Sequence, residues 1–316
     1  MLGRYLLGRY LLGRYLLGRY LLGRYLLGRR VLGRRLPRRN RPTRVPPRAS
    51  TVQVAPPTSR AAHLVYHISQ FWPTMCWEPR MPHPHLRVER NPAGYRRLLL
   101  ARPRQHNALD VGLARALRDA FAEDLAEPVV LGSTEPRVFC AGADLTMSDA
   151  DRSIVSDLLY DCYEVVVTRP GPVIAAVGGP AVGGGAQLAA AADVRIAGPA
   201  ARLRWAGPPG LDLAVGAWVL PELVGRGRAL ELITTARWVD AAEALSLGLV
   251  SQVTAEPLQA AAGLAADLVA RGPGAAAKAK MIMTTGGLLD RLHAEKQANQ
   301  SAWAQALMVG LPEATP

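Results

Sequence analysis

Between residues 86 and 197, short apolar runs alternate with stretches that have helical spacing. The apolar runs have the length of strands and are bounded by Gly, Pro or charged residues, so each predicts a buried strand. They lie at 86–89, 97–101, 128–131, 172–177 and 194–197. Strands that alternate with helices favour right-handed crossovers and mostly parallel pairing.

Helical spacing begins after Asp110, which is predicted to cap a helix that ends near Leu125. The apolar face of this helix repeats every four residues, at Leu113, Leu117, Phe121 and Leu125. Two more helices are expected over 150–168 and 185–192. Beyond Ala214 the pattern is essentially all helical, with helices expected at 214–225, 228–235, 240–247, 256–271, 273–285 and 288–308. The sequence therefore predicts an α/β fold whose core ends near residue 213, followed by a helical C-terminal region.

Two glycine-rich stretches follow two of the predicted strands and run into helical patterns. The first is VFCAGADL at 138–145, and the second is GGPAVGGGAQL at 178–188. Backbone N–H groups at such turns can point at one oxygen, and a helix N-terminus favours negative charge there. Two such donors at a thioester oxygen would form an oxyanion hole, which stabilises developing charge. The pair of motifs thus indicates acyl-CoA chemistry.

The formal net charge of +13 is concentrated at the N-terminus. Residues 1–80 contain sixteen Arg and one acidic residue, whereas residues 81–316 contain 22 basic and 24 acidic residues. The C-terminal part is therefore close to neutral and lacks the basic surface typical of nucleic-acid binding. We expect no nucleic-acid partner for this part of the chain.

The N-terminal segment begins with a five-residue repeat of the form Leu-Leu-Gly-Arg-Tyr, which covers residues 1–35. This period gives neither a helix nor a strand a constant apolar face. Residues 36–80 have the Pro-, Arg- and Ser-rich composition of disordered segments. We interpret residues 1–80 as a low-complexity segment that precedes a functional start at Met75 or Met81. A transit peptide, or a tail that binds RNA, another polyanion or a membrane surface, stays open as an alternative.

Apolar stretches in the chain are interrupted by Gly and Arg before they reach membrane-spanning length, so no membrane span is expected. Cys76, Cys140 and Cys162 have neither a paired nor a metal-ligand spacing. This cysteine usage fits a reducing cytoplasm, and no metal site is expected. Cys140 lies inside the first glycine-rich motif, where we expect a small buried packing residue rather than a nucleophile.

Five motifs in order give the chain a resemblance to the crotonase, or enoyl-CoA hydratase/isomerase, superfamily. They are RPRQHNAL at 102–109, FCAGADL at 139–145, GGG at 183–185, LVGRGRA at 223–229 and AAEALSLGLV at 241–250. The resemblance extends from about Leu86 to Ala306. It implies a crotonase-like spiral of ββα/βαβ turns within a domain over 81–316, and an acyl-CoA ligand without a separate cofactor. It also implies assembly as a homotrimer or hexamer.

Matched motif to motif, the resemblance implies that the backbone N–H groups of Ala143 and Gly184 are the two oxyanion donors. The alternative is a pair of ordinary tight turns that require small residues. Ala141 and Asp144 flank the first donor and are candidate substrate contacts. Asn107 and Asp144 are expected either to order their loops through hydrogen bonds to the backbone or to be solvated.

Hydratases of this superfamily use two glutamates for acid–base catalysis, and both positions differ here. The first falls on Gln187, whose amide cannot accept a proton at neutral pH. The second should fall within 203–209, which contains no acidic residue, and the next carboxylate along the chain is Asp212. Asp212 is either an acid–base residue or a helix-capping or solvent-facing one, and Trp205 either walls the acyl pocket or packs in the core. Efficient hydration by two glutamates is therefore not expected.

Two functions follow from these features. One is an enzyme of acyl-CoA metabolism, such as fatty-acid metabolism, that acts as an isomerase, a lyase or a weak hydratase. The other is a non-catalytic acyl-CoA-binding protein that has lost the paired glutamates. Lys278 is a candidate contact for CoA phosphates, with a plain surface role as the alternative. The chain ends in LPEATP, without the acidic-Gly segment and basic tail that are usual in relatives, so weaker CoA binding or altered assembly is expected.

Overall fold

The computed structural model describes residues 83–208 and 210–309. All of these belong to the unit formed by Trp77–Pro316. The repeat, its proposed start sites and the alternative roles of residues 1–80 lie outside the described residues.

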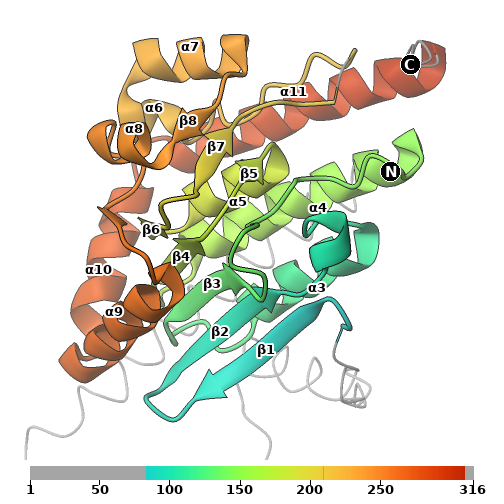
Figure 1. Ribbon diagram of the computed structural model, residues 1–316. Coiled ribbons are helices and arrows are strands. Elements are labelled where there is room, and N and C mark those ends of the chain that lie inside the picture. Colours follow the sequence, from blue (N-terminus) through green and yellow to red (C-terminus); the bar gives the residue numbers. More distant parts are fainter. Residues whose placement is uncertain (1–82, 209, 310–316) are drawn as a thin grey trace, which may run out of the picture. The chain divides into compact units, whose positions relative to one another are not determined.

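A six-stranded sheet forms the centre of this unit (Figure 1). Its strands, in spatial order, are β1 (Leu86–Asn91), β2 (Tyr95–Leu100), β3 (Val129–Ser133), β4 (Val173–Val177), β6 (Val194–Ala197) and β9 (Gln252–Val253). The β1–β2 pair is an antiparallel hairpin, and every other pair in this sheet is parallel. The predicted mostly parallel sheet is thus confirmed.

The central parallel strands are mostly apolar, and β4 is apolar at every position, because both faces of the sheet are covered. Val129 and Leu131 of β3 belong to the main core on one face, whereas Val130 belongs to a smaller core on the other. Helix α9 (Pro257–Arg271) covers the smaller core, with Ala261 and Ala265 fully buried. The helices α3 (Val111–Ala122), α4 (Asp149–Thr168) and α5 (Gly184–Ala191) bury their apolar faces in the main core.

A second, three-stranded sheet has the order β5 (Ala181–Val182), β7 (Arg202–Arg204) and β8 (Val239–Asp240). β5 runs parallel to β7, and β7 runs antiparallel to β8. These strands have two or three residues each, too few to leave a periodic pattern in the sequence. The second sheet therefore could not be anticipated from the sequence. Its first strand, β5, lies between β4 and the start of α5.

The rest of the chain is mostly helical, as the sequence predicted. The remaining helices are the short η1 (Pro103–Gln105), α6 (Leu220–Val224), α7 (Arg226–Thr235), α8 (Ala241–Ser246), α10 (Pro273–Thr284) and α11 (Leu288–Val309). The helix expected over 214–225 begins only at Leu220, and β8 and β9 interrupt the region that was expected to be all helical. Residues 210–219 instead form an irregular segment that is held by backbone hydrogen bonds to side chains of α11.

The predicted cap of α3 is confirmed, but its predicted end is wrong. The Asp110 side chain accepts a hydrogen bond from the backbone N–H of Leu113 at 2.8 Å, as an N-cap should. The helix ends at Ala122, because Asp124 adopts a left-handed conformation with φ of 37°. Leu125 consequently leaves the apolar face and is 45% exposed.

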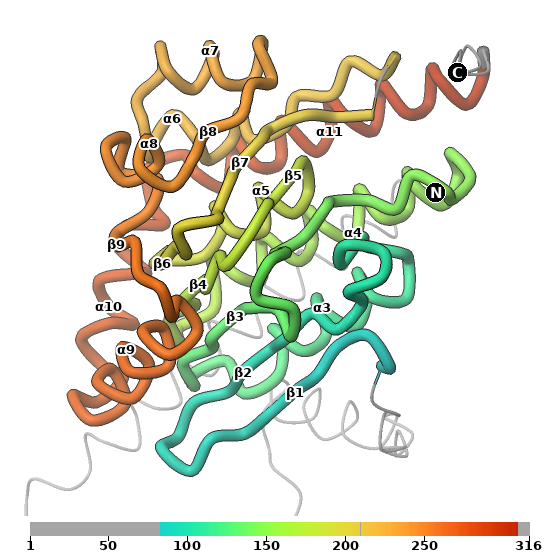
Figure 2. The backbone as a smooth tube through the Cα atoms, in the orientation of Figure 1, coloured from blue at the N-terminus to red at the C-terminus, as the bar shows by residue number. Residues whose placement is uncertain are grey.

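Helix α11 runs back along α4 in the antiparallel direction (Figure 2). Three side-chain pairs show this direction, because along them the residue numbers rise on α11 and fall on α4. The pairs are His293 with Glu164, Lys296 with Asp161, and Gln300 with Asp157. The antiparallel helices enclose the space between them and α5, where the candidate site lies.

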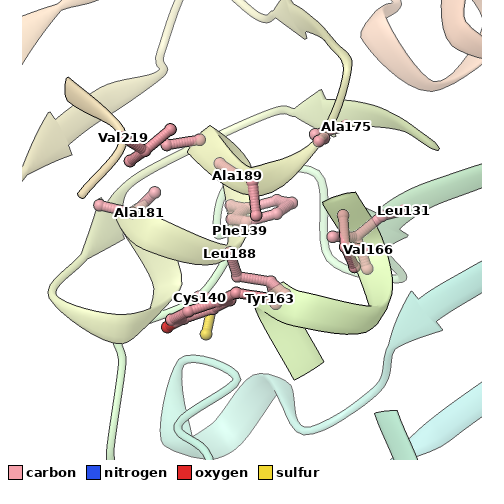
Figure 3. Packing of buried hydrophobic residues seen from close by; sticks show 14 of the residues in the cluster. Leu131, Phe139, Cys140, Tyr163, Val166, Ala175, Ala181, Leu188, Ala189 and Val219 are labelled. Atoms are coloured by element: carbon pink, nitrogen blue, oxygen red, sulfur yellow. The ribbon is translucent and has the colours of Figure 1, made fainter. Parts of the chain in front are cut away.

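Helix α5 is buried in the main core directly behind its glycine-rich start. Figure 3 shows Leu188 and Ala189 of α5 beside Phe139, with Cys140 close to Tyr163. All five side chains are almost completely buried. The first glycine-rich motif and α5 are therefore held against each other by close packing, which fixes the position of both backbones.

The loop that precedes the first motif is anchored by the fully buried Asn107. Its Oδ1 accepts a hydrogen bond from the backbone N–H of Arg102 at 2.8 Å, and its Nδ2 donates to Ser133 Oγ at 2.8 Å and to the Phe139 carbonyl at 3.0 Å. The predicted loop-ordering role of Asn107 is thus confirmed. Three segments that lie apart in the sequence are joined by this single amide.

We expect Asn107→Ala to lower the free energy of unfolding by about 3 kcal/mol, because each buried polar group left unpaired costs about 1–3 kcal/mol. The matched control is Asn91→Ala, since Asn91 also bonds a backbone N–H, that of Ala93, but in an exposed turn. The control should lose less than about 1 kcal/mol. Chemical denaturation of both variants measures the two losses, and equal losses would contradict the anchoring role of Asn107.

Candidate functional site

The two glycine-rich motifs lie side by side. The Val182 N–H donates to the Cys140 carbonyl at 2.9 Å, and the same two segments form a parallel bridge between Cys140 and Ala181. The Asp144 N–H donates to the Leu109 carbonyl at 3.0 Å, which holds the other end of the first motif. The backbones approach so closely that a Cβ built on Gly142 would lie 3.3 Å from the Gly184 nitrogen.

Two backbone N–H groups at this contact have no hydrogen-bond partner within the described part of the chain. The N–H of Ala143 lies between two residues whose backbone groups bond to Leu109. Gly184 is the first residue of α5, so its N–H has no acceptor within the helix. Both residues line one cavity. The cavity wall therefore presents two free donors, one of them at a helix N-terminus that favours negative charge.

The cavity has a volume of about 320 Å³ and extends from the two motifs along α4 and α11. Its lining from these elements comprises Ala141, Gly142, Ala143, Arg152, Ser156, Leu159, Tyr160, Tyr163, Gly184, Gln187, Asn299 and Trp303. Within the described residues, this cavity is lined by two arginines, Arg152 and Arg204, and by no carboxylate. The lining thus suits an elongated ligand with an apolar body and an oxygen to place at the two donors.

Four of the predicted site residues lie together on this cavity: Ala141, Ala143, Gly184 and Gln187. Gln187 is almost fully buried, and its Oε1 accepts a hydrogen bond from the indole N–H of Trp218 at 2.7 Å. Trp218 in turn stacks on Tyr163 with ring centroids 5.8 Å apart. The Gln187 amide is therefore held in one orientation at the cavity wall.

The structure does not bring the other four predicted residues to the cavity wall. Trp205 is 1% exposed and belongs to the main core, so its packing alternative is confirmed. Asp212 is exposed on the irregular segment before α6, and Lys278 is exposed on α10. Asp212 therefore takes the solvent-facing alternative that was left open for it.

Asp144 is buried beside the cavity and orders the first motif. Its Oδ1 accepts hydrogen bonds from the Thr146 N–H at 3.0 Å and hydroxyl at 2.7 Å, and its Oδ2 pairs with Arg102 at 2.7 Å. The Thr146 hydroxyl, followed by its N–H and by Arg102, lowers the pKa of this carboxyl below its ordinary value, against the effect of burial. The loop-ordering alternative for Asp144 is thus confirmed.

A buried polar cluster at the cavity wall was not anticipated from the sequence. The Tyr160 hydroxyl donates to Glu295 Oε1 at 2.8 Å and accepts from Asn299 Nδ2 at 2.7 Å. Tyr160 and Asn299 line the cavity, whereas Glu295 lies behind Tyr160 and is 5% exposed. A signal for this cluster existed, because Glu295 and Asn299 fall on the buried face that Leu288, Leu292 and Trp303 mark at intervals of three and four residues.

Glu295 is held by hydrogen bonds from the irregular segment as well as from Tyr160. The Gly216 N–H donates to Oε1 at 3.0 Å and the Trp218 N–H donates to Oε2 at 2.7 Å. Burial raises the pKa of Glu295 to about 7, and the hydrogen bonds oppose this rise. Glu295 is thus a carboxyl whose charge changes near neutral pH.

Both arginines that line the cavity lie over aromatic rings. The Arg152 guanidinium lies over the Trp303 ring, 5.8 Å from its centroid, and forms an ion pair with Asp149 in the first turn of α4. Arg204 lies over the Trp238 ring at 5.7 Å and donates to the Ala236 carbonyl at 2.6 Å. Both cations are therefore fixed in place by neighbouring groups.

Cys140 is fully buried, and burial raises the pKa of its thiol to about 12. The thiolate, which is the nucleophilic form, is thus strongly disfavoured, and the predicted packing role of Cys140 is confirmed. Among residues 83–208 and 210–309, no group of three or more His, Cys, Asp or Glu side chains is arranged to hold a metal ion. In the same ranges, no helix combines the length and the apolar character that a membrane crossing requires.

Comparison with known proteins identifies the family. The family model for enoyl-CoA hydratase/isomerase matches residues 91–307. This range includes both glycine-rich motifs, the cavity and nearly all of α11. The chain belongs to the enoyl-CoA hydratase/isomerase family. Its fold class, a crotonase-like α/β core with a helical C-terminal region, is confirmed by solved structures of the family.

Relatives in this family include both hydratases and isomerases. The chain is 39% identical over 204 residues to YngF of Bacillus subtilis, a candidate enoyl-CoA hydratase/isomerase, with 60% of this chain and 77% of YngF covered. An enoyl-CoA hydratase of Bacillus anthracis superimposes with a TM-score of 0.60 at 30% identity, over 71% of this chain and 91% of that one. A monofunctional enoyl-CoA isomerase of M. smegmatis superimposes with a TM-score of 0.56 at 27% identity, over 67% and 99%. Family membership therefore does not choose between the two reactions.

Proposed function

We propose that this chain binds an acyl-CoA in the cavity and stabilises the enolate of its thioester at the backbone N–H groups of Ala143 and Gly184. The observation that carries this proposal is the pair of free donors on one cavity wall, at the start of a helix. Charge that develops on a thioester oxygen is stabilised most by donors that are already in place. The proposed reaction is an isomerisation or a lyase reaction within acyl-CoA metabolism. Either reaction needs proton transfer but no separate cofactor.

Simple hydration is not proposed as the main reaction. It requires groups to activate water and to deliver a proton, and no carboxylate of the described residues lines this cavity. Gln187, whose Oε1 accepts a hydrogen bond from Trp218, cannot act as a base, because a side-chain amide does not accept a proton at neutral pH. The same observations favour a second candidate function, in which the chain holds acyl-CoA without turning it over.

A panel of CoA thioesters distinguishes these functions. We expect the full-length chain to bind enoyl-CoA thioesters in calorimetry and to convert a 3-enoyl thioester faster than it hydrates crotonyl-CoA, as followed by mass spectrometry. Free CoA is the control, because it lacks the oxygen that the two donors would bind and should bind more weakly. Binding without turnover across 2-enoyl, 3-enoyl and aromatic thioesters would favour the non-catalytic function. Equal affinity for free CoA and thioesters would contradict the proposed site.

We further propose assembly as a homotrimer or hexamer in the cytoplasm. Three consecutive apolar side chains of α10 support an assembled form, since Met281, Ile282 and Met283 are 64%, 65% and 75% exposed in the single chain. Exposed apolar surface of this kind is commonly buried by a second subunit. Light scattering coupled to gel filtration measures the assembly directly.

A further inference from the structure

We propose that this cavity takes an acyl-CoA whose acyl group ends in a carboxylate, and that Arg152 and the indole N–H of Trp303 bind this carboxylate. The inference rests on the proposed function and narrows its substrate class, because it requires the thioester oxygen to lie at Ala143 and Gly184. The two side chains would select the acyl group and take no part in proton transfer.

Arg152 lines the cavity far from the two oxyanion donors. The cavity-lining side chains of α4 share one face of the helix, at Arg152, Ser156, Leu159, Tyr160 and Tyr163. Tyr163 marks the donor end, because its hydroxyl donates to the Gly184 carbonyl at 2.9 Å. Arg152 lies eleven positions earlier on α4, about 16 Å along the helix axis. An acyl group that starts at the two donors and follows α4 therefore brings its far end to Arg152.

The guanidinium of Arg152 has donors left for a ligand. A guanidinium carries five N–H groups, and within the described residues Arg152 donates to one side chain, that of Asp149. The Trp303 ring packs against it, with the ring centroid 5.8 Å from the guanidinium carbon. The Arg152 side chain is thereby held in place and is largely shielded from water, at 16% exposed. Such a preorganised guanidinium suits the planar geometry of a carboxylate.

Two buried donors of this pair lack an acceptor in the described part of the chain. They are Nε of Arg152 and Nε1 of Trp303. Trp303 is 3% exposed, and both side chains line the cavity. Buried polar groups are nearly always hydrogen-bonded, so two unpaired donors in one place point to a ligand that brings acceptor oxygens. Ser156, one helical turn along from Arg152, adds a hydroxyl to the same stretch of wall.

The charge around the cavity favours one carboxylate over the phosphates of CoA. Two cations line it, Arg152 and Arg204, and no carboxylate of the described residues does. Asp149 compensates Arg152, whereas Arg204 donates to the uncharged carbonyl of Ala236. One positive charge thus stays uncompensated among these groups. A single carboxylate would neutralise it, whereas the several negative charges of the CoA phosphates would leave buried charge unpaired.

The test measures binding, so it does not depend on turnover. Calorimetry on the full-length chain compares suberoyl-CoA and sebacoyl-CoA, whose acyl groups end in a carboxylate, with octanoyl-CoA and decanoyl-CoA, which have the same lengths and end in a methyl group. We expect the wild-type chain to bind the carboxylate-ended member of each pair about 10- to 100-fold more tightly, the usual effect of hydrogen bonds to a charged group.

Two variants separate the contributions of the pair. Arg152→Gln should abolish the preference for the carboxylate and leave the affinity for octanoyl-CoA nearly unchanged. Trp303→Phe keeps a ring and removes only the N–H, so it should reduce the preference about 2- to 10-fold. The matched control is Arg202→Gln, because Arg202 also lies over an indole, that of Trp238 at 4.8 Å, but does not line the cavity. This control should keep the wild-type preference.

Three outcomes would overturn the inference. One is a wild-type chain that binds both members of each pair equally well. The second is a preference that survives Arg152→Gln in full or, if that variant does not fold, survives Trp303→Phe in full. The third is an Arg152→Gln variant that binds all four thioesters equally more weakly, which would assign Arg152 to the CoA phosphates instead. Absence of binding of every thioester by the wild-type chain would instead overturn the proposed function.

Discussion

A Gly142→Ala variant should lose about 10²- to 10³-fold in turnover of the best thioester, the usual effect of displacing one oxyanion donor. Gly142 adopts φ of +86°, and an added Cβ would lie 2.7 Å from the Val182 carbonyl oxygen. A backbone atom cannot rotate away as a flexible side chain can. The two glycine-rich motifs would therefore have to separate, and the N–H groups of Ala143 and Gly184 would no longer meet at one oxygen.

Affinity for the thioester should fall less than turnover does. The two donors bind an uncharged thioester oxygen in the ground state and a charged oxygen in the enolate, so most of their effect appears only during reaction. Calorimetry and turnover on the same samples measure the two losses. An equal fall in both would indicate that the variant has lost the cavity rather than the alignment of its donors.

The matched control is Gly272→Ala, at the junction of α9 and α10. Gly272 has nearly the same positive φ, +85°, but no heavy atom within 4 Å of an added Cβ. It therefore carries the backbone strain of an alanine at positive φ, about 1–3 kcal/mol, without the collision. The control should keep wild-type turnover. A folded Gly142→Ala variant that turns over like the Gly272→Ala control would contradict the oxyanion assignment.

The second large effect is expected on stability as a function of pH. The pKa of Glu295 rises from its ordinary 4.5 to about 7 in the folded chain. Between these two values the folded state holds a proton that the unfolded state has released, so the free energy of unfolding falls as pH rises through this window. A difference of this size corresponds to about 3 kcal/mol, at 1.36 kcal/mol for each pKa unit.

Glu295→Gln removes this titration. Relative to Glu295→Gln, the wild-type chain should therefore lose about 3 kcal/mol of stability between pH 4 and pH 8, with most of the loss between 4.5 and 7. Urea denaturation across this range measures the difference. Glu164→Gln is the control, because Glu164 also links α4 to α11 but is only half-buried. Parallel stability curves for the wild-type chain and Glu295→Gln would show that Glu295 titrates as an ordinary carboxyl.

Much of the fold follows from local patterns. Five strands of the main sheet, all except β9, and the helices α3, α4, α5 and α7 to α11 lie within a few residues of their predicted positions. Their apolar spacing and caps are set by neighbours in the sequence, as the Asp110 cap of α3 shows. The misplaced end of α3 and the irregular segment over 210–219 were missed, because tertiary contacts decide both. The second sheet was missed because its strands have only two or three residues.

Some residues of the candidate site could likewise be predicted from the sequence, and others could not. Ala143 and Gly184 were found from sequence because small residues beside a strand end form a motif that a single stretch of chain can display. Tyr160 and Glu295 were not found, since they are 135 positions apart and look like ordinary members of two amphipathic helices. Their partnership depends on the antiparallel register of α4 and α11, which no local pattern specifies.

By itself, the sequence determined the order of the longer helices and strands, the two glycine-rich turns and the loss of both expected glutamates, because each is a property of a short stretch of chain. Tertiary structure alone decided which polar groups face the cavity. It left Asp212 in solvent and buried Trp205 in the core. It also placed a carboxyl with a pKa near neutrality behind Tyr160. Burial and charge at a site depend on what the rest of the chain brings beside it, and that is fixed only when the helices pack together.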